Sequence, residues 1–371
     1  MDNINIGDLA IEKLEEAYRM RGHANVLIAG RTGVGKSTLI NSVFQGDLAR
    51  VGQGRPVTKN TREITREDVP LSIFDTRGLE MSEFADTIEA LEQFIAERHR
   101  DPDQKKHIHV AWVCIAEDLR RVEAAETELT GMLTKFVPVI GVVTKARSDN
   151  GFRAEVQRLL PLTRNVLRVR SIKETLDDGY SIPSMGLTDL VRSTMELVPE
   201  GQKMAFAAAQ KADLLLKKQR SQKIVVAAAS TAAGIGATPI PFADAALLVP
   251  VQVGMLARIS SAYGLSFTSG SLSTLVASIA GGAVAVITGR LIVGSLLKLV
   301  PGAGMVGGGV IAAGTAGAMT TALGSTYISI LDALFTKHAG EPPSEEEVIE
   351  EVKRRFGNAP PGGLGSTSSA E

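Results

Sequence analysis

The chain contains almost no cysteine and almost no net charge. Cys114 is the single cysteine among 371 residues, so no disulfide can form within the chain, and this usage is typical of a reducing compartment. The formal net charge is −1 and the basic residues are dispersed, which gives no electrostatic case for DNA or another nucleic acid as a partner. Residues 1–5 lack the basic and apolar regions of a secretory signal. We therefore expect the protein to begin in the cytoplasm.

Charge is also nearly absent from a long part of the C-terminal half. Between residues 224 and 331 the charged side chains are Asp244, Arg258, Arg290 and Lys298. The uncharged stretches 259–289 and 299–331 each exceed the roughly 20 residues that a helix needs to cross a bilayer. Their many Gly, Ala, Ser and Thr residues suit close helix packing. This composition favours membrane association. The alternative is a water-soluble bundle with a buried central hairpin, in which Asp244 would pair with Arg258 or Arg290.

A phosphate-binding loop lies near the start of the chain. Residues 30–37 read G-R-T-G-V-G-K-S, which completes the pattern G-x-x-x-x-G-K-S between an apolar run at 26–29 and a helix-forming run at 38–41. In such a loop backbone N–H groups cradle phosphate oxygens, the lysine reaches the β- and γ-phosphates, and the serine hydroxyl ligates Mg²⁺. The sequence therefore predicts a nucleoside triphosphate bound by Gly30, Thr32, Gly33, Val34, Gly35, Lys36, Ser37 and Thr38.

Short β-branched runs alternate with helical stretches from residue 25 to about residue 197. The predicted strands are 26–29, 64–68, 71–74, 109–115, 137–143 and 166–169. The alternation predicts an α/β fold, a three-layer P-loop NTPase domain with a mainly parallel sheet, followed by an all-α hydrophobic domain. We expect four segments: an N-terminal amphipathic helix at 1–22 that packs against the nucleotide domain, the nucleotide domain at 23–199, a hydrophobic helical domain at 200–340, and a charged helix with a disordered tail at 341–371.

Two further elements complete the predicted metal and γ-phosphate site. Asp75-Thr76-Arg77-Gly78 follows the apolar run 71–74, which is the position of a D-x-x-G element. In that element the carboxylate holds Mg²⁺ through water and the glycine amide senses the γ-phosphate. The polar loop 54–62 carries two threonines that can close over Mg²⁺. Thr58 is preferred because its distance from the phosphate loop resembles that of the metal-binding threonine of Era-like GTPases, and Thr61 is the alternative. The predicted metal ligands are Ser37, Thr58 and Asp75.

With these motifs in this order, residues 25–175 resemble an Era-like small GTPase domain of the translation-factor-related class. The resemblance implies GTP or GDP and Mg²⁺ as ligands. That family reads guanine with Asn/Thr-Lys-x-Asp, and Thr144 and Lys145 match this motif. Arg147 stands where the aspartate belongs, and an arginine cannot accept a hydrogen bond. Asp149 is the expected substitute, and Ser171, in a Ser-Ile-Lys loop similar to the family's, is the further expected contact with the base.

The resemblance also implies hydrolysis of GTP, with Lys36, Thr58 and Gly78 as the catalytic residues. Leu79 occupies the position at which Ras-type enzymes carry the glutamine that orients the attacking water. Gly33 occupies the position of the asparagine found in potassium-activated relatives. We therefore expect slow intrinsic hydrolysis. Arg31 and Arg77 flank the site and are candidates to neutralise transition-state charge, in cis or across a homodimer of nucleotide domains.

The segment 238–255, together with 297–304, resembles an uncharacterised hydrophobic domain that recurs behind GTPase domains and in bacterial inner-membrane proteins. The likeness covers about residues 205–335. Its prolines and glycines predict helices near 203–237, 243–262, 271–299 and 304–335.

The preferred hypothesis for function is a GTP-dependent switch whose helical domain is held by or released to the cytoplasmic face of a membrane. Two alternatives stay open. One is a soluble GTPase that assists assembly of the ribosome or another complex, and the other is a scaffold that binds nucleotide without efficient turnover.

Overall fold

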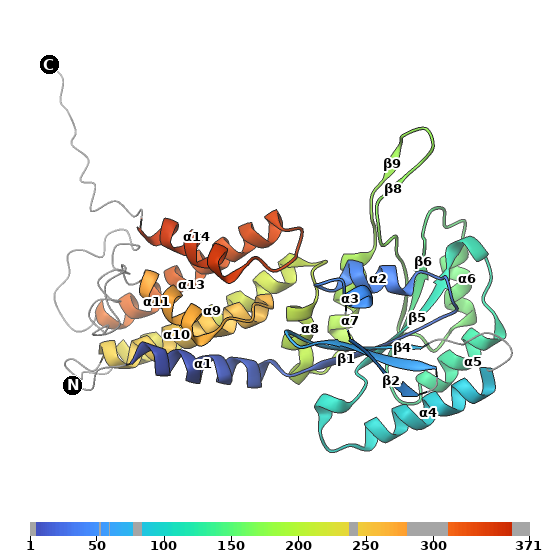
Figure 1. Ribbon diagram of the computed structural model, residues 1–371, viewed down its shortest axis with the longest axis horizontal. Helices are drawn as coiled ribbons and strands as arrows, with labels where there is room; N and C mark the ends of the chain where they lie inside the picture. The colour runs from blue at the N-terminus through green and yellow to red at the C-terminus, as the bar shows by residue number, and fades with distance from the viewer. Residues whose placement is uncertain are drawn as a thin grey trace. The chain divides into compact units, whose positions relative to one another are not determined.

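The computed structural model describes residues 5–51, 53–58, 60–76, 84–236, 244–279 and 311–357 (Figure 1). The chain divides into two compact units. The nucleotide unit comprises residues 20–217 and 339–341, and the helical unit comprises residues 1–19, 218–338 and 342–371. Each unit is described by itself.

A seven-stranded sheet forms the centre of the nucleotide unit, in the order β2-β3-β4-β1-β5-β6-β7. Strands β4, β1, β5, β6 and β7 run parallel, and β2 and β3 extend the sheet antiparallel. Every residue of β1, β4, β5 and β6 is buried, which explains their continuous apolar runs. The strands are β1 (Ala24–Ala29), β2 (Gln53–Thr58), β3 (Thr61–Arg66), β4 (Val69–Thr76), β5 (Val110–Ala116), β6 (Val139–Thr144) and β7 (Asn165–Arg168).

Helices cover both faces of this sheet. One buried cluster joins Phe44 and Trp112 with residues of α2, α7 and α8, and another joins Leu27 and Phe74 with residues of α4 and α5. This three-layer arrangement confirms the predicted α/β fold with a mainly parallel sheet. The helices of the unit are α2 (Lys36–Val43), α3 (Leu48–Val51), α4 (Phe84–Arg100), α5 (Ala124–Leu133), α6 (Phe152–Leu159), α7 (Leu187–Leu197) and α8 (Lys203–Ala209).

Two local predictions were wrong. The polar loop expected at 54–62 lies largely in strands: residues 54–58 belong to the edge strand β2 and residues 61–62 to β3. Pro56 is tolerated in β2 because an edge leaves one side of the ladder unpaired. The helix expected over 203–237 is broken after Ala209, and α9 (Leu214–Gly236) follows. Gln210 is extended and its neighbours pair with the end of α2: Gln45 N donates to Ala209 O at 3.0 Å and Lys211 N donates to Val43 O at 2.8 Å. These bonds replace the helical ones.

A short hairpin that the sequence did not predict lies between β7 and α7. Its strands are β8 (Glu174–Thr175) and β9 (Ser181–Ile182), and Figure 1 shows it projecting from the unit. Its root is closed by a pair of backbone hydrogen bonds at 3.0 Å between Arg170 and Met185.

Among the described residues of the helical unit the regular elements are all helices, as predicted for an all-α domain. Close contacts use small residues: a side chain on Gly324 would meet Val225 and Met255 within 3.0 Å. The Ser260 and Tyr327 hydroxyls lie 2.7 Å apart. The helices are α1 (Ile6–Arg21), most of α9, α10 (Asp244–Tyr263), α11 (Ser269–Ile279), α13 (Ile311–Lys337) and α14 (Glu345–Gly357).

The N-terminal helix corrects an expectation about packing. Residues 1–19 belong to the helical unit, where the Tyr18 hydroxyl donates to Phe267 O at 3.0 Å. The sequence had favoured packing against the nucleotide domain. The predicted pairing of Asp244 concerns a side chain outside the described residues, as does Arg290, so it stays a hypothesis.

Among the described helices, one segment is long and apolar enough to cross a membrane by length and composition alone. This segment comprises residues 316–337 of α13. Within this segment an apolar stretch of 18 residues is 56% buried in the structure, as it would also be in the core helix of a water-soluble bundle.

Candidate nucleotide-binding site

The predicted phosphate loop joins the central strand β1 to helix α2. At Gly30, with a φ of +149°, a Cβ atom would lie 2.5 Å from Cys114 O, so only glycine lets β1 turn this close to β5. Gly35, with a φ of +98°, is the residue before the first turn of α2. The loop therefore ends on the N-terminus of a helix, whose free N–H groups and dipole favour an anion.

The side chains of the predicted phosphate loop differ in their contacts and exposure. Lys36 Nζ donates to Gly30 O at 2.5 Å and to Arg31 O at 3.0 Å, so the ammonium group is folded back over the loop. Thr32, Ser37 and Thr38 are exposed, whereas Val34 is buried. Arg31 is paired with Glu123, a carboxylate that also lies 3.0 Å from Arg121 Nη2.

Thr144 ties the phosphate loop to the loop that was predicted to read the base. Its hydroxyl lies 2.6 Å from Val34 O and 3.2 Å from Ile115 O and donates to them. Both acceptors lie on neighbouring elements at the carboxyl edge of the sheet. The threonine is buried, so these bonds form in a low dielectric. The structure thus brings together the phosphate loop and the Thr-Lys motif, 110 residues apart.

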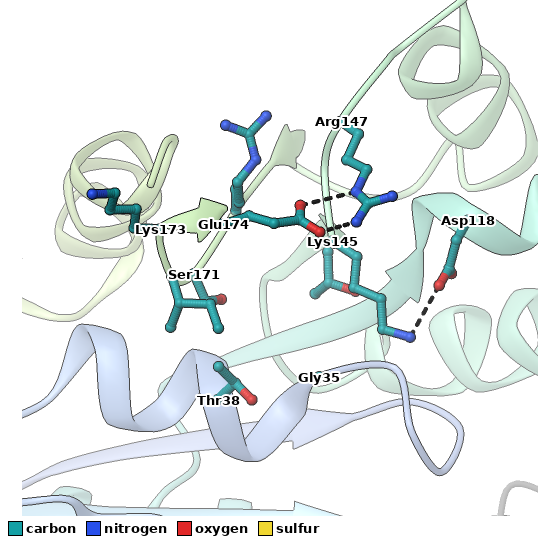
Figure 2. A pocket seen from close by; sticks show the side chains of 11 residues that line it. Gly35, Thr38, Asp118, Lys145, Arg147, Ser171, Lys173 and Glu174 are labelled. Atoms are coloured by element: carbon teal, nitrogen blue, oxygen red, sulfur yellow. Dashed lines mark hydrogen bonds and ion pairs between the residues drawn. The ribbon is translucent and has the colours of Figure 1, made fainter. Parts of the chain in front are cut away.

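A pocket of about 390 Å³ opens beside these two loops (Figure 2). It contains five of the predicted nucleotide contacts: Gly35, Thr38, Thr144, Lys145 and Ser171. The remaining residues that line it are Asp118, Arg147, Arg170, Ile172, Lys173 and Glu174. Lys145 has a left-handed backbone, with a φ of +52°, and its Nζ lies 3.1 Å from an Asp118 carboxylate oxygen.

Asp149, the expected substitute for the missing aspartate, is not among the described residues that line this pocket. Its carboxylate accepts from Arg153 N at 2.9 Å at the start of α6 and lies 3.4 Å from Arg168 Nε. The carboxylate that Arg147 meets in the pocket is Glu174 instead, with Arg147 Nε donating to Oε2 at 2.9 Å.

Glu117 is a structural residue of the site that the sequence analysis missed. One carboxylate oxygen accepts from Arg147 N at 2.6 Å and Ser148 N at 2.7 Å, and the other accepts from Arg168 Nε at 2.7 Å. Burial alone would raise the pKa of Glu117, but these donors outweigh it and lower the pKa. An acidic residue directly after a buried parallel strand, at the edge where such sheets bind ligands, was the available signal.

The residues predicted to hold Mg²⁺ come from three elements. Ser37 lies in the first turn of α2, and Asp75 lies near the end of β4, paired with Ile28 of β1 just before the phosphate loop. Asp75 is buried, and Arg62 Nε lies 3.4 Å from its Oδ2. These hydroxyl and carboxylate oxygens are hard ligands of the kind that Mg²⁺ prefers, so the donor set fits this metal.

Thr58 and Thr61 differ in exposure. Thr58 ends β2 and is half-buried, whereas Thr61 is buried with its hydroxyl 3.4 Å from that of Thr76. The hydroxyl of Thr58 is therefore the more accessible of the two. The predicted γ-phosphate contact Gly78, together with Arg77 and Leu79, lies outside the described residues.

Two family models match the chain. Residues 25–145 match the 50S ribosome-binding GTPase family, and residues 200–356 match a domain of unknown function (DUF697). The chain thus contains a GTPase domain followed by this second domain, which is the fusion that the sequence predicted.

Among curated proteins, the chain is similar to magnetosome membrane protein 22 of Magnetospirillum gryphiswaldense, with 36% identity over 27% of this chain and 50% of that protein. It is also similar to the tRNA modification GTPase MnmE of Cupriavidus necator, with 31% identity over 34% of this chain and 27% of that protein. The chain therefore spans half or less of these relatives.

Among solved structures, the chain is similar to the G domain of the T. maritima FeoB iron transporter, with 17% identity, a TM-score of 0.30, and coverage of 47% of this chain and 98% of that one. It is also similar to Toc33 from Arabidopsis thaliana in complex with GDP and Mg²⁺, with 16% identity, a TM-score of 0.32, and coverage of 57% and 97%.

Proposed function

We propose that this chain, a GTPase domain joined to a domain of unknown function, is a GTP-dependent switch that hydrolyses GTP slowly and couples its nucleotide state to a membrane-associated helical domain. The amides of the loop 30–37 and Lys36 would hold the phosphates. Ser37, Thr58 and Asp75 would hold Mg²⁺, which neutralises phosphate charge when it is bound. Thr144, Lys145 and Ser171 would contact the nucleoside, and Gly78 would sense the γ-phosphate.

The observation that carries this proposal is the 2.6 Å hydrogen bond from Thr144 to Val34 O. It links a phosphate loop at a helix N-terminus to a pocket lined by the next predicted motif, so that one ligand with a polyphosphate and a nucleoside fits both. A phosphate loop alone would support any nucleotide or a free phosphate.

Slow hydrolysis is proposed from the residues at the positions that would act on the γ-phosphate. Leu79 has no group that can orient water. Arg31, one candidate to neutralise transition-state charge, is held by Glu123. A second chain that supplies Arg77 or releases Arg31 would raise the rate, which makes a homodimer of nucleotide domains the proposed source of activation.

Membrane association is supported by composition and by one relative. Residues 224–331 hold only four charged side chains, and large apolar side chains such as Val226 and Leu247 are at least half exposed. The name of magnetosome membrane protein 22 places that relative in a membrane. By this proposal the helices associate with lipid when the switch residues change their order with the γ-phosphate.

Nucleotide binding is tested by calorimetry with GTP, GDP and ATP in magnesium buffer. We expect GTP and GDP to bind, and Lys36→Ala to lose GTP binding while the circular dichroism spectrum stays unchanged. Single-turnover hydrolysis then separates an enzyme from a scaffold, because a scaffold does not turn over GTP. A hydrolysis rate that rises with protein concentration would indicate activation by a dimer. Absence of heat with every nucleotide would contradict the proposal.

The membrane part is tested by flotation of the purified chain with liposomes of anionic and neutral lipid, in GDP, in a non-hydrolysable GTP analogue and without nucleotide. The proposal expects the floating fraction to differ between the GDP and GTP-analogue samples. A chain that binds GTP but never floats would instead support the soluble assembly GTPase.

A further inference from the structure

The pocket poses a problem of base recognition. The base of a nucleotide is read through hydrogen bonds to its Watson–Crick edge, and on guanine this edge carries two donors, N1–H and N2–H, beside the acceptor O6. A carboxylate suits the two donors because it only accepts hydrogen bonds. Arg147, at the position expected to supply that carboxylate, only donates.

We propose that Glu174 is the carboxylate that recognises the base, and that it selects guanine. This inference rests on the nucleotide binding proposed above. Glu174 lines the same pocket as Gly35 and Thr38, on strand β8 directly after the loop of Ser171. It comes from a hairpin rather than from the Thr-Lys loop.

The backbone of Glu174 is fixed relative to the Thr-Lys loop. Glu174 pairs with Ile182 across the hairpin. At the root of the hairpin, buried Arg170 donates from Nε to Ala146 O at 2.8 Å and from Nη1 to Pro183 O at 2.6 Å. One guanidinium thus joins the hairpin to the loop that carries Arg147.

The side chain of Glu174 is oriented by Arg147. The Nε and Nη2 groups of Arg147 meet the two carboxylate oxygens, with Nε to Oε2 at 2.9 Å. Arg147 is itself anchored through its backbone N–H, which donates to Glu117. A carboxylate oxygen has two lone pairs, so Glu174 keeps acceptor capacity for a ligand while it is held by Arg147.

The direction of the pocket places Glu174 at the base end. Figure 2 shows Gly35 and Thr38 at one end of the pocket, and Glu174 and Arg147 at the opposite end. With the phosphates at the helix N-terminus, the outer edge of the base reaches Glu174. N1–H and N2–H of guanine then donate to its carboxylate, and Arg147 retains N–H groups for O6.

Asp118 is the other carboxylate among the described residues that line the pocket. It lies beside Lys145, with which it pairs at 3.1 Å, and its side chain is 54% exposed against 30% for Glu174. Figure 2 shows Asp118 at the side of the pocket rather than at the end opposite Gly35. Its position suits a contact with the ribose side of the ligand more than with the outer edge of a base.

The test is competition binding of GTP, ITP, XTP and ATP to the full chain in magnesium buffer. ITP lacks the 2-amino donor, and XTP has a carbonyl oxygen in its place. We expect the wild type to prefer GTP over ITP and over XTP by about 10-fold or more each, because each change removes or opposes one hydrogen bond to a charged group. ATP turns the lone pair of its N1 toward the carboxylate and should bind more weakly still.

Glu174→Gln is the decisive variant, because the amide can donate to the xanthine oxygen. We expect it to lose at least about 10-fold in GTP affinity and to bring the GTP-to-XTP ratio near or below one. Asp177→Asn removes the same charge from the exposed turn of the hairpin and should keep the wild-type ratios.

Unchanged ratios in Glu174→Gln, or a shift that appears only in Asp118→Asn, would overturn the inference. The inference would also be overturned if the wild type bound GTP and ATP with equal affinity. If Lys36→Ala then lost the binding of both nucleotides, the proposal of nucleotide binding would still stand. The failure of the underlying proposal looks different, because then no triphosphate binds.

Discussion

The Nδ1 atom of His109 accepts a hydrogen bond from the backbone N–H of Asn25 at 2.8 Å, and its Nε2 lies 3.0 Å from Gln104 O. Both contacts are satisfied by one neutral tautomer. A protonated ring would turn a second N–H against the N–H of Asn25. Burial, the largest cause, lowers the pKa of His109 to about 4, from 6.5 in the unfolded chain.

The unfolded chain therefore binds more protons than the folded chain between pH 6.5 and about pH 4. The free energy of unfolding therefore has no loss from this group above pH 6.5 and decreases as the pH falls. The total loss, reached below about pH 4, is about 3 kcal/mol. His109→Asn keeps an acceptor for Asn25 N but does not titrate. Urea unfolding at pH 7.5, 6, 5 and 4.5 should show a smaller loss in this variant than in the wild type.

His99→Asn, an exposed substitution in the last turn of α4, is the control and should keep the wild-type loss, since His109 is intact. If the free energy of unfolding fell equally with pH in the wild type and in His109→Asn, this histidine would not be the titrating group.

The link between Thr144 and Val34 predicts a loss of nucleotide affinity in Thr144→Val. The substitution keeps the shape of the side chain and leaves Val34 O without its hydroxyl donor, which costs about 1–3 kcal/mol for a buried group. We expect GTP affinity to fall about 10-fold because the two loops are no longer held together. Fluorescence titration with a labelled GTP measures this.

Thr130→Val is the matched control for that prediction. Thr130 is also buried in the nucleotide unit, but its hydroxyl donates within helix α5 to Glu126 O. Its removal should leave GTP affinity unchanged. Equal effects of the two variants would mean that the Thr144 effect is one of general stability.

Asp75 predicts a specific dependence on magnesium. If its carboxylate holds the metal, Asp75→Asn should lower GTP affinity in magnesium buffer by about 10-fold, to the value that the wild type shows in EDTA. In EDTA the two proteins should bind alike. Asp68→Asn, at the exposed turn between β3 and β4 where Asp68 pairs with Arg66, should retain the magnesium effect in full. A magnesium effect in Asp75→Asn as large as in the wild type would exclude Asp75 as a ligand.

Sequence reasoning found the parts of the site that depend on neighbouring residues. A glycine-rich loop between an apolar strand and a helix is a local pattern, and the parallel sheet follows from the alternation of strands and helices. Thr144 and Ser171 were identified through the resemblance of their short motifs to the base-reading motifs of Era-like GTPases, and both line the pocket.

The remaining parts depend on contacts between distant segments. Arg31 meets Glu123 and Arg147 meets Glu174, and neither pairing leaves a trace in local composition. The edge strand β2 forms because β3 offers it a free ladder, although its Gly and Pro residues have low strand propensity. The hairpin of Glu174 is short and polar, so its residues show no alternation long enough to identify a strand.

Two glycines of the helical unit give a matched test of its packing. On Gly324 of α13, a Cβ atom would lie 2.5 Å from Val225 Cγ2 and 2.9 Å from Met255 Sδ, so Gly324→Ala must displace side chains that hold α9 and α10 together. We expect it to destabilise the unit by about 1–3 kcal/mol, as overpacking does. On Gly234 of α9 a Cβ would meet nothing within 4 Å, so Gly234→Ala should stabilise by about 0.5–1 kcal/mol through helix propensity alone. Thermal melting followed by far-UV circular dichroism measures both, and it should give shifts of opposite sign. Two shifts of the same sign would mean that α9, α10 and α13 do not pack in solution as they do in this structure, because only that packing distinguishes one helical glycine from the other.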